Sequence, residues 1–219
     1  MSLSLNSLVN KLERAYGVAE WWPSESAFEV AVGAILTQRT SWTNVQAAIG
    51  NLKSSAMMSP SAMSSCEVSS LQEVIRPSGF YRQKARYLRS FSSHLLDRYG
   101  GDIERMGDRP VSELRRELLS IEGIGPETAD TIMLYALNLP SFVVDSYSFR
   151  LLDRLGIYSG RDYGHVKAMF ERALGLDAKR LSSAHAAVVI HCKEHCLVRP
   201  RCRGCPVRRL CPSKAHDDE

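Results

Sequence analysis

Four cysteines near the C-terminus have a spacing that suits a metal centre. They follow the pattern Cys196-x5-Cys202-x2-Cys205-x5-Cys211. Four thiolates in one short segment suit a single site, either zinc or a [4Fe-4S] cluster. A zinc ribbon usually presents two Cys-x2-Cys pairs, and this segment has one, which favours the [4Fe-4S] cluster. Cys192 is an alternative first ligand, and a set of scattered buried thiols remains another interpretation.

A second chemical feature is a tight turn that carries Gly123 and Gly125. An amphipathic segment from 111 to 119 precedes it, and Pro126 stands where the next helix should begin. Glycines allow a ligand to approach the backbone, and free amides at a helix start bind anions such as phosphate. We therefore predict that Gly123, Gly125 and Thr128 contact a nucleic-acid backbone. The alternative is a plain connection between two helices.

A third feature is Asp145, which follows the apolar run Phe142 to Val144. The sequence predicts that Asp145 caps a helix beginning near Ser146. A carboxylate at a helix N-terminus is stabilised in its ionised form, which suits a catalytic role. Taken alone, Asp145 has a simpler interpretation as a helix cap.

The elements that must position these residues are predicted to be helices. Apolar residues recur at spacings of three and four, and strand signals are scarce, so we expect an all-α protein of about ten short helices. The segment from 53 to 70 is expected to be a loop with some helical turns. The 219 residues are 44% hydrophobic and 24% charged, which is typical of a globular protein.

Charge and hydropathy limit the partners and the compartment. Net charge is only +4, but seven basic residues and one acidic residue lie between Lys193 and Lys214. This segment is predicted to face phosphates, and a solvated surface is the alternative. No apolar run reaches membrane-spanning length, and no signal peptide is recognisable. We expect a cytoplasmic, nucleoid-associated monomer without membrane contact.

From Trp21 to Cys211 the chain resembles the helix-hairpin-helix, Gly/Pro-Asp superfamily of DNA glycosylases, which includes endonuclease III. The resemblance implies that Asp145 is the catalytic carboxylate and that the partner is double-stranded DNA with a damaged base. Gln38, in the run Leu-Thr-Gln, resembles the residue that enters the gap left by the flipped nucleotide. The first two cluster ligands are separated by five residues here and by six in endonuclease III.

An informative departure from endonuclease III is Glu127. Endonuclease III places a Schiff-base lysine two residues after the second hairpin glycine, and this chain has glutamate there. Glutamate cannot form an imine, so the resemblance implies base release by water without strand cleavage.

A closer resemblance is to the bacterial 3-methyladenine DNA glycosylases of the same superfamily. It is carried by Trp-Trp-Pro at 21–23, Leu-Thr-Gln-x-Thr at 36–40, Arg-Pro-Ser-Gly-Phe-Tyr-x-Gln-Lys-Ala at 76–85, Gly-Ile-Gly-x-Glu-x-Ala-Asp at 123–130 and Val-Val-Asp-x-Tyr-Ser at 143–148. Those glycosylases lack an iron–sulfur segment. The resemblance implies a base pocket made of Trp22, Pro23, Trp42, Tyr147, Glu127 and Lys193. In this pocket Trp22 with Pro23 and Trp42 would sandwich the flipped base. Each aromatic residue has packing in the core as its alternative.

The resemblance predicts two helical subdomains. Residues 24–139 would form a helical barrel with the hairpin, and residues 1–23 with 140–219 would carry the cluster. DNA would bind in the cleft between them. We expect a monofunctional glycosylase for an alkylated purine such as 3-methyladenine. The alternatives are a uracil, thymine-mismatch or oxidised-base glycosylase, and a non-catalytic helix-hairpin-helix DNA-binding protein.

Overall fold

The chain is helical throughout the residues that the structure describes. The computed structural model describes residues 4–17 and 22–213, and within these ranges it contains eleven α-helices and no strand. The prediction of an all-α protein is confirmed. None of the described helices is both long and apolar enough to cross a membrane.

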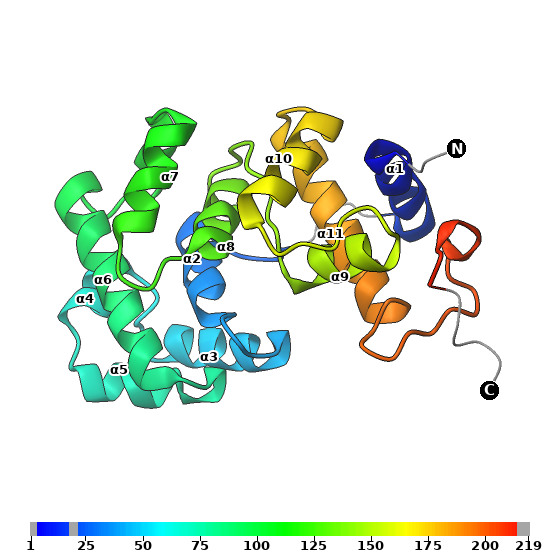
Figure 1. Cartoon of the computed structure of the whole chain (residues 1–219). Coiled ribbons are helices and arrows are strands. Elements are labelled where there is room, and N and C mark those ends of the chain that lie inside the picture. The colour runs from blue at the N-terminus through cyan, green and yellow to red at the C-terminus, as the bar shows by residue number, and fades with distance from the viewer. Residues whose placement is uncertain (1–3, 18–21, 214–219) are drawn as a thin grey trace. The chain divides into compact units, whose positions relative to one another are not determined.

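The helices form two compact units, made of residues 22–139 and of residues 1–21 with 140–219. The first contains α2 (Ala27–Leu36), α3 (Trp42–Ser54), α4 (Pro60–Ser65), α5 (Val68–Val74), α6 (Tyr81–Tyr99), α7 (Val111–Ser120) and α8 (Pro126–Thr131), with short turns η1 (Arg76–Ser78), η2 (Glu104–Asp108) and η3 (Ile132–Ala136). The second contains α1 (Leu5–Tyr16), α9 (Ser146–Arg154), α10 (Tyr163–Leu174), α11 (Ala178–Glu194) and the short η4 (Arg208–Leu210) (Figure 1).

Helix α2 is the centre of the 22–139 unit. Every residue from Phe28 to Leu36 is buried, as expected for a helix that is apolar around most of its surface, and its one charged residue, Glu29, pairs with Lys53. It packs against α3, α6, α8 and η3, and Phe28 stacks on Phe91 of α6 with ring centroids 6.3 Å apart. Because α2 is enclosed in the core, the turn that follows it, with Gln38, has a rigid support.

The segment from 53 to 70 is more ordered than predicted. Where the sequence predicts a loop with some helical turns, it contains the end of α3, the whole of α4 and the start of α5. Helix α4 begins where Ser59 accepts a hydrogen bond from the amide of Ala62 and Pro60 occupies the first turn. Both are standard helix-start signals. Met63 is fully buried, so the apolar core stabilises this short helix.

In the other unit, helices from opposite ends of the chain pack together. Helix α1 lies against α11 (Figure 1), and it buries Leu8, Val9 and Leu12. Arg180 of α11 forms an ion pair with Glu13 of α1. Helix α9 also packs against α11, so α11 is the common support for the helix that Asp145 precedes.

Candidate functional site

The turn between α7 and α8 has the hairpin geometry that the sequence predicts. Helix α7 ends at Ser120, Gly123 has a φ of +84°, and Pro126 is the first residue of α8. Among the described residues no side chain caps α8, and Gly125 is exposed, with none of their atoms within 4 Å of the position a Cβ would take. The backbone at the start of α8 is therefore open to a ligand.

Gln38 is bonded to this hairpin from the turn after α2. Its Nε2 donates to the carbonyl oxygen of Gly123 at 2.9 Å and to Oγ1 of Thr128 at 3.1 Å. Thr128 is only 6% exposed, so its hydroxyl faces the protein. The structure thus unites three of the residues predicted to contact DNA, and the two polar side chains contact each other.

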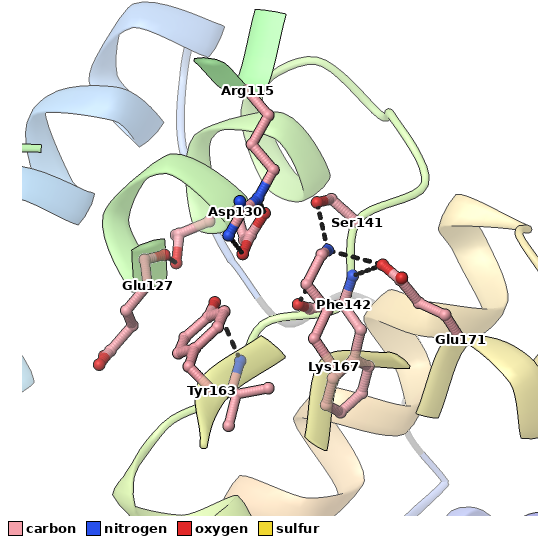
Figure 2. Close-up of polar contacts among 10 residues, drawn as sticks. Arg115, Glu127, Asp130, Ser141, Phe142, Tyr163, Lys167 and Glu171 are labelled. Carbon is pink, nitrogen blue, oxygen red and sulfur yellow. Dashed lines mark hydrogen bonds and ion pairs between the residues drawn. The ribbon is translucent and has the colours of Figure 1, made fainter. Parts of the chain in front are cut away.

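A partly buried ion pair fastens α8 to α7. Arg115 Nε and Nη2 donate to the two carboxylate oxygens of Asp130 at 2.8 and 3.1 Å (Figure 2). Asp130 is fully buried. A bidentate pair fixes both distance and orientation, so the two helices of the hairpin hold a defined angle around the turn.

An aromatic group forms around Trp22 in the same unit. The indoles of Trp22 and Trp42 meet edge to face with centroids 5.1 Å apart, and Tyr135 lies 5.4 Å from Trp22. Pro23 is exposed. Because the two indoles touch, a base can stack between them only after they separate. Trp21 lies outside the described residues.

Tyr135 is a member of this group that the sequence analysis missed. It lies in η3, where the amide of Leu137 bonds to the carbonyl of Ile132, five residues back. Such wide turns are frequent at functional sites because they redirect a side chain. The irregular turn depends on tertiary packing and has no signal in the sequence.

Phe80 is a second residue that the sequence analysis missed. Its side chain is 57% exposed, and its φ of +46° is unusual for a bulky residue. Four residues after Phe80, buried Lys84 donates from Nζ to the carbonyls of Leu36 and Ser78, each at 2.7 Å. Ser78 belongs to the turn that precedes Phe80. Burial lowers the pKa of Lys84 to about 8. An exposed phenylalanine therefore stands on a firmly bonded turn.

In the other unit, Asp145 caps α9 as predicted. Its Oδ1 accepts from the amide of Ser148 at 2.8 Å and from the hydroxyl of Ser148 at 3.0 Å. The side chain is 13% exposed, and Nε2 of buried His185 lies 3.5 Å from Oδ2. Although burial opposes ionisation, His185 and Ser148 together hold the pKa of Asp145 below its usual value. Asp145 is therefore an ionised, oriented carboxylate.

His185 is the third residue that the sequence analysis missed. It lies among alanines and valines on α11, and its ring meets that of Phe142 edge to face. A histidine within the otherwise apolar run from 184 to 190 is the only signal that the sequence offers. Its position identifies α11 as the element that faces the carboxylate.

The remaining predicted pocket residues differ in exposure. Tyr147 is half-buried beside Asp145 and lies under the guanidinium of Arg150, which is 5.0 Å from the ring centroid. Burial and the neighbouring Asp145 raise the pKa of Tyr147. Lys193 is exposed on the last turn of α11, and Glu127 is exposed on the first turn of α8.

The four C-terminal cysteines surround one cavity, although they are not arranged as a ligand set. Cys196, Cys202, Cys205 and Cys211 all line it. Within the described ranges, however, no group of three or more His, Cys, Asp or Glu side chains is placed to hold a metal ion. The predicted cluster geometry is thus not present, but four thiols around one cavity are the donor set that such a group requires.

Arginines fasten the loop of this cavity to α9. Arg154 donates to Sγ of Cys196 at 3.3 Å and to two neighbouring carbonyls, and Arg150 donates to the Cys196 carbonyl at 2.7 Å. Hydrogen bonds from Cys192, His191 and Arg154 hold the pKa of Cys196 below its usual value. Burial raises the pKa of Cys205. Basic side chains thus stabilise a thiolate at Cys196.

Comparison with known proteins identifies the family to which these features correspond. The sequence model of one family, described as the HhH-GPD superfamily base excision DNA repair proteins, matches residues 32–175. A Methanocaldococcus jannaschii protein, provisionally designated a DNA repair glycosylase, is 43% identical over 201 residues, which cover 91% of each chain.

Two solved structures are also similar. The first is the H. pylori 3-methyladenine DNA glycosylase bound to 1,N6-ethenoadenine, with a TM-score of 0.78, 29% identity and coverage of 88% of this chain and 98% of that one. The second is endonuclease III in a non-covalent complex with DNA, with a TM-score of 0.81, 22% identity and coverage of 94% and 92%. At that identity the second comparison shows a common fold.

Proposed function

This chain belongs to the HhH-GPD superfamily of base excision DNA repair proteins, and we propose that it is a monofunctional glycosylase for alkylated purines. The observation that supports this most directly is the ionised Asp145, oriented by Ser148 and His185. The structurally similar H. pylori protein is a 3-methyladenine glycosylase, which favours a methylated purine as the substrate.

Asp145 would act on the sugar of a nucleotide flipped out of the duplex. The bond between C1′ and the base breaks with both electrons leaving on the base, so positive charge develops on the sugar. The carboxylate stabilises that charge and orients a water molecule, which adds to C1′ and gives its proton to the carboxylate or to solvent. An alkylated purine already carries positive charge, so little further acid catalysis is needed.

The aromatic group of Trp22, Trp42 and Tyr135 would receive the base. A cationic ring is attracted to the face of an indole by about 0.5–2 kcal/mol for each contact. In the structure the two indoles contact each other, so we infer that a base enters by displacing one of them. Tyr147, Glu127 and Lys193 stay proposed as pocket residues.

Gln38 and Phe80 would enter the duplex at the gap that the flipped nucleotide leaves. The exposed ring of Phe80 can fill the space between base pairs, and the amide of Gln38 can form hydrogen bonds with the base that has lost its partner. The amides near Gly123 and Gly125 would bind the DNA backbone, which sets position without reading sequence.

Glu127 supports the monofunctional mode. It stands on the exposed first turn of α8, and a carboxylate cannot form an imine with the sugar. Borohydride should therefore trap no enzyme–DNA adduct during turnover. Endonuclease III, which has a lysine nucleophile, serves as the positive control, and a covalent product with this chain would refute the proposal.

Cys196, Cys202, Cys205 and Cys211 would hold a [4Fe-4S] cluster. When bound, such a cluster would cross-link the C-terminal loops through its four cysteine ligands and could accept or donate one electron. Cys192 is the alternative first ligand, since it contacts Cys196. The base-release step does not involve this group.

The decisive experiment is a glycosylase assay with Asp145→Asn. Oligonucleotides would carry 3-methyladenine, hypoxanthine, uracil, mismatched thymine or 8-oxoguanine. We expect wild type to release the methylated purine, and Asp145→Asn to lose at least about a thousandfold in rate while binding DNA normally. Asparagine still caps a helix, so α9 should persist.

Asp177→Asn is the matched control, because Asp177 caps α11 in the same way and is exposed. It should retain full activity. Base release by Asp145→Asn at the wild-type rate would contradict the mechanism. Release of uracil, thymine or 8-oxoguanine alone would contradict the alkylpurine assignment and leave the glycosylase assignment intact.

A further inference from the structure

The segment that leads to Asp145 is buried and is neither helix nor strand. Ser141 to Val144 are all at most 1% exposed, and this segment has no strand partner among the described residues. Backbone amides and carbonyls that are removed from water need hydrogen-bond partners. In a sheet a neighbouring strand would supply them, and here another element must do so.

Side chains of α10 supply these hydrogen bonds (Figure 2). The amide of Phe142 donates to Oε1 of Glu171 at 3.0 Å. Lys167 Nζ donates to the carbonyl of Phe142 at 3.4 Å and to Oγ of Ser141 at 2.6 Å. The amide of Val144 donates to the hydroxyl of Tyr163 at 3.4 Å.

The three side chains form one stripe on α10. Tyr163, Lys167 and Glu171 are spaced by four residues, which places them on the same face of a helix. Lys167 and Glu171 also bond to each other at 2.6 Å and are 13% and 19% exposed. On the same side, Phe170 stacks on Phe142 with ring centroids 3.9 Å apart.

We propose that Tyr163, Lys167 and Glu171, here termed the α10 clamp, are positioning residues that fix the location of Asp145. Ser148 orients the carboxylate from within α9, but the helix start itself is placed by the segment that enters it. The clamp bonds to the backbone of two alternate residues of that segment, Phe142 and Val144, and Val144 is the residue before Asp145. The catalytic part of this inference rests on the proposed glycosylase function.

The first test measures the clamp itself, without DNA. Amide hydrogen exchange of residues 141–146 is compared for wild type, Glu171→Ala and Glu171→Gln. Loss of the acceptor in Glu171→Ala should speed exchange of the Phe142 amide by about tenfold or more. Glutamine retains an oxygen acceptor, so Glu171→Gln should remain within about threefold of wild type. Arg172→Ala, an exposed change at the next position of α10, should have no effect.

The second test measures base release in single-turnover assays with the same variants. Misplacement of the carboxylate should lower the rate constant of Glu171→Ala by about tenfold or more, while its dissociation constant for DNA stays within about twofold. Glu171→Gln should recover most of the rate. A variant that only loses folded protein would instead show a smaller reaction amplitude at the wild-type rate constant.

The two assays separate the two proposals. Unchanged exchange in Glu171→Ala would overturn the clamp, as would faster exchange with an unchanged rate constant for base release. If wild type releases no base from any oligonucleotide, the proposed glycosylase function fails. The exchange data then still decide whether α10 holds the segment before Asp145.

Discussion

At the scale of single residues, the two hairpin glycines are under different constraints. A Cβ on Gly123 would lie 2.0 Å from the ring of Tyr87, and the φ of +84° disfavours any other residue. A Cβ on Gly125 would meet nothing within 4 Å. Gly123 is thus required by the fold, while Gly125 leaves space at the surface that we assign to DNA.

Substitution of the two glycines by alanine should therefore have opposite outcomes. Gly123→Ala forces the Tyr87 ring or the turn to move and should lower the free energy of unfolding by at least about 2 kcal/mol. Gly125→Ala should change it by less than about 0.5 kcal/mol and weaken DNA binding. Urea denaturation and fluorescence anisotropy measure the two effects. Equal stability losses would contradict this assignment.

Local signals predicted two helix starts correctly. Pro126 and Asp145 mark helix starts through their own backbone preferences, so a single sequence was sufficient to place α8 and α9. His185, Tyr135 and Phe80 were missed because their importance comes from what folding places beside them. Gln38 was selected by resemblance, but its bonds to Gly123 and Thr128 join residues far apart in the chain.

At the scale of elements, Glu117 of α7 joins the two helices that precede the hairpin. Its Oε1 accepts from Nε2 of His94 and from the hydroxyl of Tyr99, both at 2.8 Å, and Arg109 lies 3.4 Å from Oε2. Burial opposes ionisation of Glu117, but the bonds from Tyr99 and His94 lower its pKa overall. Burial and the bond to Glu117 raise the pKa of Tyr99 to about 12.

This network predicts a pH dependence of stability. Because the folded pKa of Glu117 is below its unfolded value, its contribution is present above the unfolded value of 4.5 and is lost as pH falls through the folded pKa. Glu117→Gln should cost about 2 kcal/mol at pH 7, and the difference from wild type should shrink in acid.

Denaturation at a series of pH values measures this difference. The control is Glu73→Gln, because Glu73 pairs with Arg76 at the surface and is 69% exposed. It should change stability by less than about 0.5 kcal/mol at any pH. A constant penalty for Glu117→Gln from pH 7 to pH 3 would contradict the role assigned to its charge.

The elements themselves could be predicted only where the sequence contains local signals. Residues 53–70 are rich in Ser and Met, so their composition indicates a loop, although Ser59 and Pro60 begin a helix there. Burial of Met63 stabilises α4, and burial depends on contacts with other elements. For the same reason, the support that α10 gives to Ser141–Val144 could not be predicted from spacing alone.

At the scale of the whole molecule, the C-terminal segment differs from the helical remainder. Beyond α11, the described residues up to 213 contain only the short η4 as a regular element, and this segment is fastened to α9 through Arg150 and Arg154. Cysteine spacing predicted a common location for four thiols, and they do line one cavity. The spacing could not predict their exact arrangement, because most of the segment after α11 has no regular secondary structure that would fix it.

Metal analysis should therefore find about four irons per chain in the anaerobically purified protein, with visible absorbance. Cys211→Ser should lower iron content and thermal stability. Cys66→Ser is the matched control and should lower neither, because Cys66 belongs to the 22–139 unit and is not among the residues that line the cavity. Stoichiometric zinc in a colourless protein would contradict the cluster assignment.

Lys84 has a mechanical consequence for DNA recognition. One nitrogen serves both the end of α2, two residues before Gln38, and the turn two residues before Phe80. Neither turn can shift without stretching a bond shielded from water, since Lys84 is 1% exposed. The two turns are therefore mechanically coupled, so DNA binding that displaces one turn should also displace the other.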